Sequence, residues 1–197
     1  MTYIKRGQWP IAIIFVILVL FFTPRFINSE NYEFLLYIAM MVVLATVIVV
    51  TNKKINYSNT TLCGLLIWAG LHMAGGGIYV NGMRLYTIML ITLSETYHIF
   101  RFDQFVHIFG FAIATLVVYE VLKPMLKPEH KWFGLSFVVI MAGVGIGAFN
   151  EIVEFIATVL VPETGVGGYI NTSLDLVSNL IGAVISMIII YFRESKR

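Results

Sequence analysis

Long apolar runs separated by short polar segments make up nearly the whole chain. Six of these runs come close to the roughly 20 residues that one helical crossing of a bilayer requires. The pattern therefore predicts an all-α fold: a polytopic integral membrane helix bundle of about six transmembrane helices, forming a single membrane domain over residues 1–197. The expected spans are about 9–22, 34–50, 62–80, 103–122, 132–160 and 174–192.

Two apolar segments need separate interpretation. The first span follows Lys5 and Arg6 as a signal peptide would, but the segment 23–26 offers no small-residue cleavage site, so we expect a retained anchor. The run from Leu85 to Leu93 is too short to cross a bilayer. We expect it to form a re-entrant or interfacial segment.

Composition supports the membrane assignment. The chain is 59% hydrophobic and 12% charged, with a mean hydropathy of +0.88, which leaves too little polar material to cover a soluble domain. A net charge of +2 with dispersed basic residues gives no indication of nucleic-acid binding. Cys63 is the only cysteine, so no intrachain disulfide can form.

The basic residues predict the orientation of the bundle. With the N-terminus inside, the inner segments hold ten of them: Lys5, Arg6, Lys53, Lys54, Lys123, Lys127, Lys131, Arg193, Lys196 and Arg197. The outer segments hold three: Arg25, Arg84 and Arg101. Because cytoplasmic loops carry the excess of Lys and Arg, both termini are expected to be cytoplasmic in a multi-pass cell-membrane protein.

The only two aspartates open the same motif on two different spans. The motifs are Asp103-x-x-x-His107-x-x-Gly110 and Asp175-x-x-x-Asn179-x-x-Gly182. Positions i, i+4 and i+7 lie on one helix face, so each span presents a carboxylate, a His or Asn, and a glycine as one stripe. These spans would run parallel, with both aspartates at the outer mouth of the bundle.

Other ionisable residues fall at a similar depth. Glu151 and Glu154 share one face of the fifth span, and His72 lies in the outer half of the third. Polar groups inside hydrocarbon are costly and mark a functional site by default. The pattern therefore predicts one polar site in the outer half of the bilayer, facing the extracytoplasmic side.

Each of these residues also has a structural interpretation. An aspartate in the first turn of a helix can serve only as a cap, and His72 can be a hydrogen-bonded core histidine. Gly143 and Gly147 form a GxxxG pattern, which indicates close helix packing. The outer loop 162–173 can be a lid or an ordinary turn, whereas Glu120 and His98 are expected to be solvated.

The charge balance indicates what fills the site. Four carboxylates without a nearby Lys or Arg must take up protons, admit water or bind a cation. Imidazole together with carboxylates suits Zn²⁺, Mn²⁺ or Fe²⁺ better than Mg²⁺ or Ca²⁺. The candidate metal ligands are His72, Asp103, His107, Glu151, Glu154 and Asp175, with Asn150 and Asn179 as supporting residues.

Three motifs also carry a resemblance to known membrane proteins. They are Asp103-x-x-x-His107, Asn150-Glu151-x-x-Glu154 and Thr172-Ser173-x-Asp175-x-x-x-Asn179-x-x-Gly182-Ala183. Together they resemble the pattern of VanZ-like proteins. The stretch 71–77, with His72 before three glycines, is more similar to the YjdF-type inner-membrane family (DUF2238). The resemblance covers roughly residues 60–190.

What the resemblance implies is a bacterial-type protein of the cell envelope. The YjdF-type family is functionally uncharacterised, and VanZ-like proteins are associated with resistance to glycopeptides such as teicoplanin. This chain has Gln104 where VanZ-like proteins often have Lys, and it lacks their Arg before Asp175. These departures make an anionic substrate less well supported.

Two functional hypotheses follow. The first is a membrane enzyme that acts on a lipid or lipid-linked envelope substrate, with Glu151 or Glu154 as general base or metal ligand and with Asp103, His107 and Asp175 holding the metal or acting as acid. The second is a proton- or cation-coupled transporter or ion-binding protein that uses the same acids. A structural or partner-binding membrane subunit is the third alternative.

Overall fold

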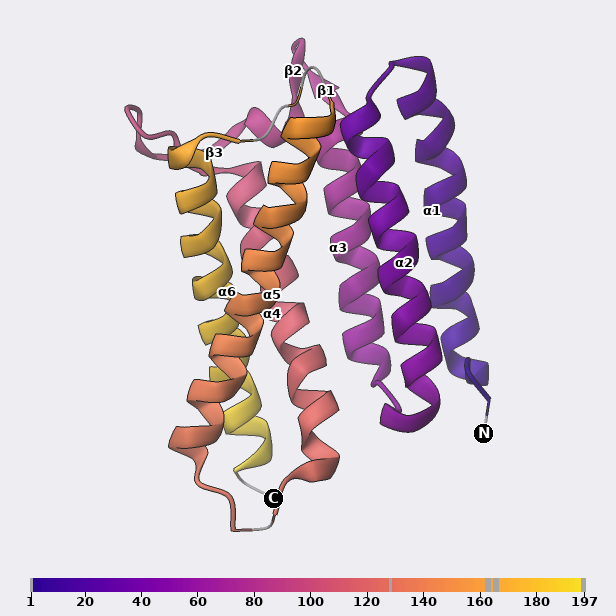
Figure 1. The fold of residues 1–197 in the computed structure, drawn as a ribbon, viewed down its shortest axis with the longest axis vertical. Helices are drawn as coiled ribbons and strands as arrows, with labels where there is room; N and C mark the ends of the chain where they lie inside the picture. The colour runs from indigo at the N-terminus through magenta and orange to yellow at the C-terminus, as the bar shows by residue number, and fades with distance from the viewer. Residues whose placement is uncertain (1, 128, 162–163, 165–166, 196–197) are drawn as a thin grey trace.

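The computed structural model describes residues 2–127, 129–161, 164 and 167–195. Its long elements are six helices that run along the longest axis of the molecule (Figure 1). They are α1 (Trp9–Asn28), α2 (Tyr32–Ile55), α3 (Asn59–Gly77), α4 (Phe102–Leu122), α5 (Trp132–Leu160) and α6 (Tyr169–Glu194). All except α3 are both long and apolar enough to cross a membrane. The prediction of an all-α polytopic bundle is confirmed.

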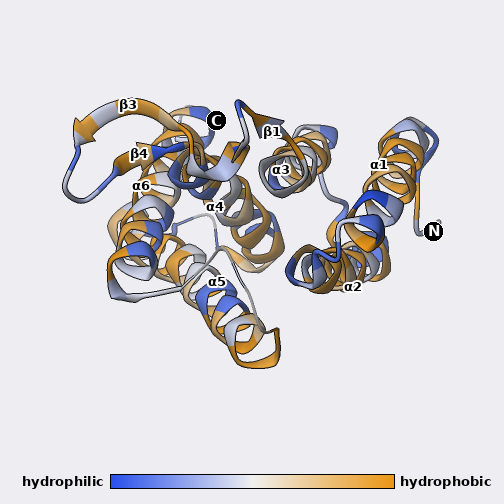
Figure 2. Cartoon of the chain, turned by 90° about the horizontal axis from the view of Figure 1, so that it is seen from above, coloured by the Kyte–Doolittle hydropathy of each residue, from blue (hydrophilic) through white to orange (hydrophobic). Residues whose placement is uncertain are grey.

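The helices form two groups of three. Seen from above, α1, α2 and α3 lie on one side and α4, α5 and α6 on the other, and α3 packs against α4 between them (Figure 2). Both chain ends lie at the same end of the bundle (Figure 1). Helices α4 and α6 run in the same direction, as the repeated motif predicted, and both begin at the opposite end.

Helix boundaries differ from the predicted spans in α1, α2, α3 and α6, and the end of α1 and the start of α6 need comment. Helix α1 continues through Pro24 to Asn28, because the single backbone hydrogen bond that a proline removes does not end this apolar helix. Helix α6 begins at Tyr169, so Asp175 lies in its second turn rather than its first. The alternative that Asp175 is only an N-terminal cap is therefore wrong.

The segment between α3 and α4 is a pair of small antiparallel ribbons. Strands β1 (Tyr79–Val80) and β2 (Met83–Arg84) pair first, followed by a 3₁₀ turn, η2 (Leu85–Thr87). Strands β3 (Met89–Ser94) and β4 (Ile99–Arg101) then form a hairpin that leads directly into α4. This segment lies at the end of the bundle (Figure 1), and its re-entrant or interfacial placement in a membrane stays a prediction.

Glycines allow α4, α5 and α6 to pack closely. A Cβ atom on Gly182 would meet the backbone carbonyl oxygen of Ile108 in α4. A Cβ on Gly143 would meet the Thr115 hydroxyl, and one on Gly147 would come within 2.6 Å of the Asn179 amide. The prediction that these glycines permit close packing is confirmed.

Large side chains fill the other group of helices. Phe26, Phe34, Tyr37 and Met73 are buried together where α1, α2 and α3 meet.

At the far end of the bundle, Glu120 of α4 contacts the start of α3. It accepts hydrogen bonds from the Ser58 N–H at 3.1 Å and from the Thr61 hydroxyl at 2.8 Å. Glu120 therefore joins α4 to α3 and is not simply solvated.

Candidate metal centre

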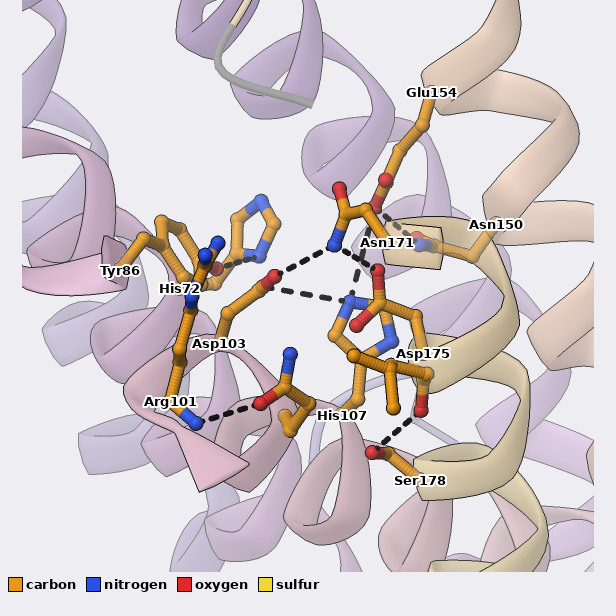
Figure 3. Close-up of polar contacts among 12 residues, drawn as sticks. His72, Tyr86, Arg101, Asp103, His107, Asn150, Glu154, Asn171, Asp175 and Ser178 are labelled. Atoms are coloured by element: carbon orange, nitrogen blue, oxygen red, sulfur yellow. Dashed lines mark hydrogen bonds and ion pairs between the residues drawn. The ribbon is translucent and has the colours of Figure 1, made fainter. Parts of the chain in front are cut away.

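His107 lies at the centre of the predicted site. Its Nε2 atom is 3.7 Å from Asp103 Oδ1, one turn earlier on α4, and 3.8 Å from Glu154 Oε1 on α5 (Figure 3). The imidazole also stacks on Phe111 with ring centroids 5.8 Å apart. His107 is only 6% exposed. A single imidazole edge therefore faces carboxylates from two helices inside the bundle.

A hydrogen bond on the other ring nitrogen determines the tautomer of His107. Its Nδ1 atom lies 3.0 Å from Asn179 Oδ1 on α6. The amide oxygen can only accept, so Nδ1 carries the proton and donates it. In the neutral form of the ring, Nε2 then presents its lone pair toward Asp103 and Glu154. Histidine ligands to metals are typically held in this way, with the second ring nitrogen donating to a fixed acceptor.

Asn171 connects the two aspartates across α4 and α6. Its Nδ2 atom donates to Asp175 Oδ2 at 2.7 Å and to Asp103 Oδ2 at 3.3 Å (Figure 3). Asp103, His107 and Asp175 each offer a ligand atom within 4.8 Å of the others. The predicted approach of the two motifs is thus observed, and it brings together carboxylates that are both largely buried.

The two glutamates of α5 occupy different positions. Glu154 is on the Nε2 side of His107 and accepts a hydrogen bond from Asn150 at 2.8 Å. Glu151 Oε1 lies 3.7 Å from Nδ1, on the opposite edge of the ring. Glu151 is 7% exposed, and within the described part of the chain neither of its carboxylate oxygens has a hydrogen-bond partner. The two carboxylates thus lie at different edges of the ring, although His107, Glu151 and Glu154 each offer a ligand atom within 4.8 Å of the others.

His72 does not join the ligand atoms around His107. It is enclosed by aromatic rings, with Phe34, Tyr37 and Trp68 centroids within 5.6 Å of its own. Its Nδ1 atom lies 2.5 Å from the hydroxyl of Tyr86 in η2. Burial raises the pKa of the Tyr86 phenol well above its usual range, so the hydroxyl stays protonated and donates. The hydrogen-bonded core interpretation of His72 therefore fits better than direct ligation.

A small cavity separates His72 from the carboxylates. It is bounded by Tyr37, His72 and Tyr86 on one side and by Asp103 and Glu154 on the other. The space open to the centre of a water-sized sphere is about 40 Å³. One ordered water needs roughly 10–15 Å³ by this measure, so the cavity has room for a few waters or a small polar group.

Two arginines lie on the outer side of this cavity. Arg84 lines it and contacts the buried Glu33 carboxylate at 3.5 Å. Arg101, which is drawn in Figure 3, directly precedes α4 and is close enough to Asp175 to act electrostatically on its carboxyl group. The expectation that no Lys or Arg lies near the acids is therefore wrong, because a long side chain reaches back from the helix start.

Several residues of this region have weak sequence signals. Asn171 is four residues before Asp175, so extending the i, i+4 stripe by one turn would have found it. Glu33 and Tyr37 have the same spacing on α2. Arg84 and Tyr86 come from an irregular segment, where no helical period predicts which side chains turn inward.

The atoms around Nε2 meet the distance limit for one divalent cation, whereas the Asp175 ligand atom is placed only within 4.8 Å of those of Asp103 and His107. Two atoms that each lie about 2.1 Å from one ion are at most about 4.2 Å apart. The 3.7 Å and 3.8 Å separations around Nε2 meet that condition. They are too long for direct hydrogen bonds. Asp175 Oδ1 is buried and, among the described residues, also lacks a hydrogen-bond partner.

Comparison with known proteins gives the family. Neither the curated proteins nor the solved structures include a significant match. The VanZ-like resemblance remains a prediction. A family described as "Predicted membrane protein (DUF2238)" matches residues 9–196, nearly the full chain and well beyond the motifs of the last three helices. The chain therefore belongs to the DUF2238 family of membrane proteins.

Proposed function

We propose that this protein is a membrane metalloenzyme with one divalent cation bound among α4, α5 and α6. The observation that carries the proposal is the orientation of His107. Its Nδ1–H is held by Asn179, and its Nε2 faces Asp103 and Glu154. A buried imidazole whose lone pair points at separated carboxylates is arranged as a ligand, not as the donor of a salt bridge.

The proposed ligands are His107, Asp103, Glu154 and Asp175. One imidazole with three carboxylates suits Mn²⁺ or Fe²⁺ best, and it also accommodates Zn²⁺. Asn171, Asn150 and Asn179 hold individual ligands by hydrogen bonds. Glu151 lies behind the ring at Nδ1, where its charge would raise the basicity of the imidazole.

The proposed chemistry is hydrolysis of a lipid or lipid-linked envelope substrate. A bound divalent cation lowers the pKa of water to about 7. A carboxylate of the site would accept the proton of the attacking water and return it to the leaving oxygen. The cavity beside Asp103 and Glu154 would hold the reacting group. Burial of the site among apolar helices favours a substrate that is itself in the membrane.

Metal analysis of purified protein tests the metal centre. We expect about one Mn, Fe or Zn per chain in the wild type. We expect near-complete loss in Asp103→Asn, His107→Ala, Glu154→Gln and Asp175→Asn, with double variants little worse than single ones. Glu95→Gln and His98→Ala, on the exposed hairpin turn, are the matched controls. A wild type that binds no more metal than the His107→Ala variant would refute the proposal.

Lipid analysis tests the enzyme. Cells that express the wild type or Glu154→Gln would be compared by mass spectrometry of their lipid extracts. A lipid species that disappears with the wild type and persists with the variant supports hydrolysis. Identical lipid profiles, together with metal flux into proteoliposomes that depends on Glu154, would instead support the transporter alternative.

The side on which the site opens is a separate part of the proposal. In a Cys63→Ser background, a cysteine at Asn28 should react with an impermeant thiol reagent from outside the cell, and one at Glu129 should not. Both positions are exposed and lie at opposite ends of the bundle. The reverse labelling would place the site on the cytoplasmic side and exclude an external envelope substrate.

A further inference from the structure

Strand β3 of the β3–β4 hairpin is apolar and largely exposed. Strand β3 has the sequence Met-Leu-Ile-Thr-Leu-Ser, without a charged residue. Leu90, Ile91 and Leu93 are 44%, 58% and 67% exposed. These residues do not alternate between a buried and a solvated face, so both faces of the strand lack cover from the rest of the chain.

Such a hairpin is not expected to persist in water. A two-stranded ribbon without a packed face is marginally stable at best. A long apolar edge strand exposed to solvent also invites aggregation. Strand β3 pairs only with β4 within the described residues, so its other edge carries unpaired backbone groups. The hairpin therefore requires an apolar environment that the protein itself does not provide.

Its position indicates what that environment is. In Figure 1 the hairpin projects sideways beyond α6, level with the ends of the helices. In the view from above it again lies outside the ring of helices (Figure 2). The surface directly beneath it is thus the lipid that surrounds the bundle. Exposed tyrosines accompany it, with Tyr97 in the turn and Tyr169 at the start of α6.

We propose that the β3–β4 hairpin inserts into the leaflet on the site's side of the membrane. The apolar side chains of β3 would lie at the boundary between headgroups and acyl chains, continuous with the lipid-facing surface of α6. Tyr97 would lie among the headgroups, where aromatic rings with a polar tip are favoured. This contact is independent of whether the site binds a metal.

The insertion would also connect the lipid to the site. The hairpin is preceded by Arg84 and Tyr86, which line the cavity, and it ends at Arg101, two residues before the cavity-lining Asp103. The backbone N–H of Phe102 donates to the carbonyl of Ile88 at 2.8 Å, which fixes the base of the hairpin to the start of α4. One wall of the cavity is therefore continuous with the lipid-inserted hairpin.

Fluorescence quenching on the full-length protein in phosphatidylethanolamine and phosphatidylglycerol vesicles tests the insertion. In a Cys63→Ser background, a bimane label at Ile91→Cys would be compared with one at Asn28→Cys, an exposed polar position on the same end of the bundle. We expect lipids with a nitroxide near the headgroup to quench Ile91 about threefold more than Asn28, and iodide to show the opposite preference. Adding Leu93→Asp should make the label at Ile91 accessible to iodide quenching.

Two results would overturn the inference. Equal iodide quenching at Ile91 and Asn28 would place the hairpin in water. Efficient disulfide cross-linking between two Ile91→Cys chains, with loss of lipid quenching, would show that β3 instead pairs with a second copy of the protein. Because neither readout depends on metal content, failure here leaves the metal proposal standing, and failure of the metal proposal leaves the hairpin proposal standing.

Discussion

The helices of the group α1–α3 and those of the group α4–α6 pack against one another by different means. In α1–α3, large side chains such as Phe26, Phe34 and Met73 fill the space between the helices. In α4–α6, glycines bring the backbones together, and Gly182 leaves no room for a side chain against Ile108. Only the second group encloses several carboxylates.

This difference explains where a polar site can be built. Apolar packing gains little in a bilayer, because lipid is as apolar as the side chains it replaces. Close backbone approach instead lets short polar side chains such as Asp175 and Asn179 reach across to a neighbouring helix. In the aromatic group, the buried His72 makes one hydrogen bond to Tyr86 and is otherwise surrounded by rings.

The largest loss of stability is expected when a side chain is added where the backbones of α4 and α6 lie closest together. Gly182→Ala should destabilise the protein by about 3 kcal/mol, because the new methyl group meets α4 backbone atoms that cannot rotate away. Thermal unfolding in detergent would measure the change. The matched control is Gly145→Ala on α5, where a Cβ meets nothing within 4 Å. Equal behaviour of the two variants would show that close backbone approach does not hold this group together.

The same substitution in the aromatic group should cost less. Gly76→Ala in α3 would meet the ring of Phe34, which is a side chain and can shift. We expect a loss of about 1–2 kcal/mol, smaller than at Gly182. If Gly76→Ala proved the more damaging change by thermal unfolding, the contrast between side-chain packing and backbone packing would be reversed.

An intermediate effect is expected at the acceptor that orients His107. Asn179→Ala removes the partner of Nδ1–H and should weaken metal binding about 10- to 100-fold, as loss of such partners typically does. Competition with a fluorescent chelator would measure the affinity. Asn179→Asp keeps an acceptor at this position and should retain more affinity. Unchanged binding in the alanine variant would indicate that Nε2 is not a ligand.

A smaller effect is expected at the hydrogen bond in the aromatic group. Tyr86→Phe removes the donor to His72 and should cost about 1 kcal/mol of stability without altering metal content. Thermal unfolding and elemental analysis of the same sample would separate the two quantities. Loss of the metal in the Tyr86→Phe variant would indicate that His72 is a metal ligand after all.

The smallest effect is expected at the opposite end of α4. Lys123 Nζ lies 2.8 Å from Glu194 Oε2, but the lysine side chain is 45% exposed. Lys123→Gln should change stability by no more than about 0.5 kcal/mol, since exposed ion pairs contribute little. A larger loss of stability would show that polar contacts outside the site also hold α4, α5 and α6 together. The site end and the opposite end of this group would then differ less in how much their polar contacts contribute.

The sequence predicted the helices and the convergence of the site through one property, the periodicity of helical side chains. Where that periodicity holds, the faces that carry Asp103, His107, Glu154 and Asp175 come together between α4, α5 and α6. The start of α6 was placed too late because Asn171, Thr172 and Ser173 are polar and were assigned to a loop. They are helical because that turn faces other polar groups rather than lipid.

Tertiary contacts account for the remaining differences. The separation of Glu151 from Glu154 depends on which ring edge of His107 each one faces, and helical spacing does not encode this. The inclusion of Arg84 and Tyr86 depends on an irregular turn with no period. The position of His72 was identified by its place in an apolar run, but its role required knowing that Tyr86 donates to it.

Helix α3 has a consequence for how the protein enters the membrane. It is the one long helix that falls short of the apolarity of a spanning segment, since it contains threonines, several glycines and His72. Because polar residues make insertion into lipid less favourable, we expect α3 to be stable in the membrane only when it packs against neighbouring helices. The side of the cavity that His72 and Tyr86 form would then be completed only after α4 has been synthesised. Assembly of the site and stable insertion of α3 into the membrane would occur together, late in biogenesis.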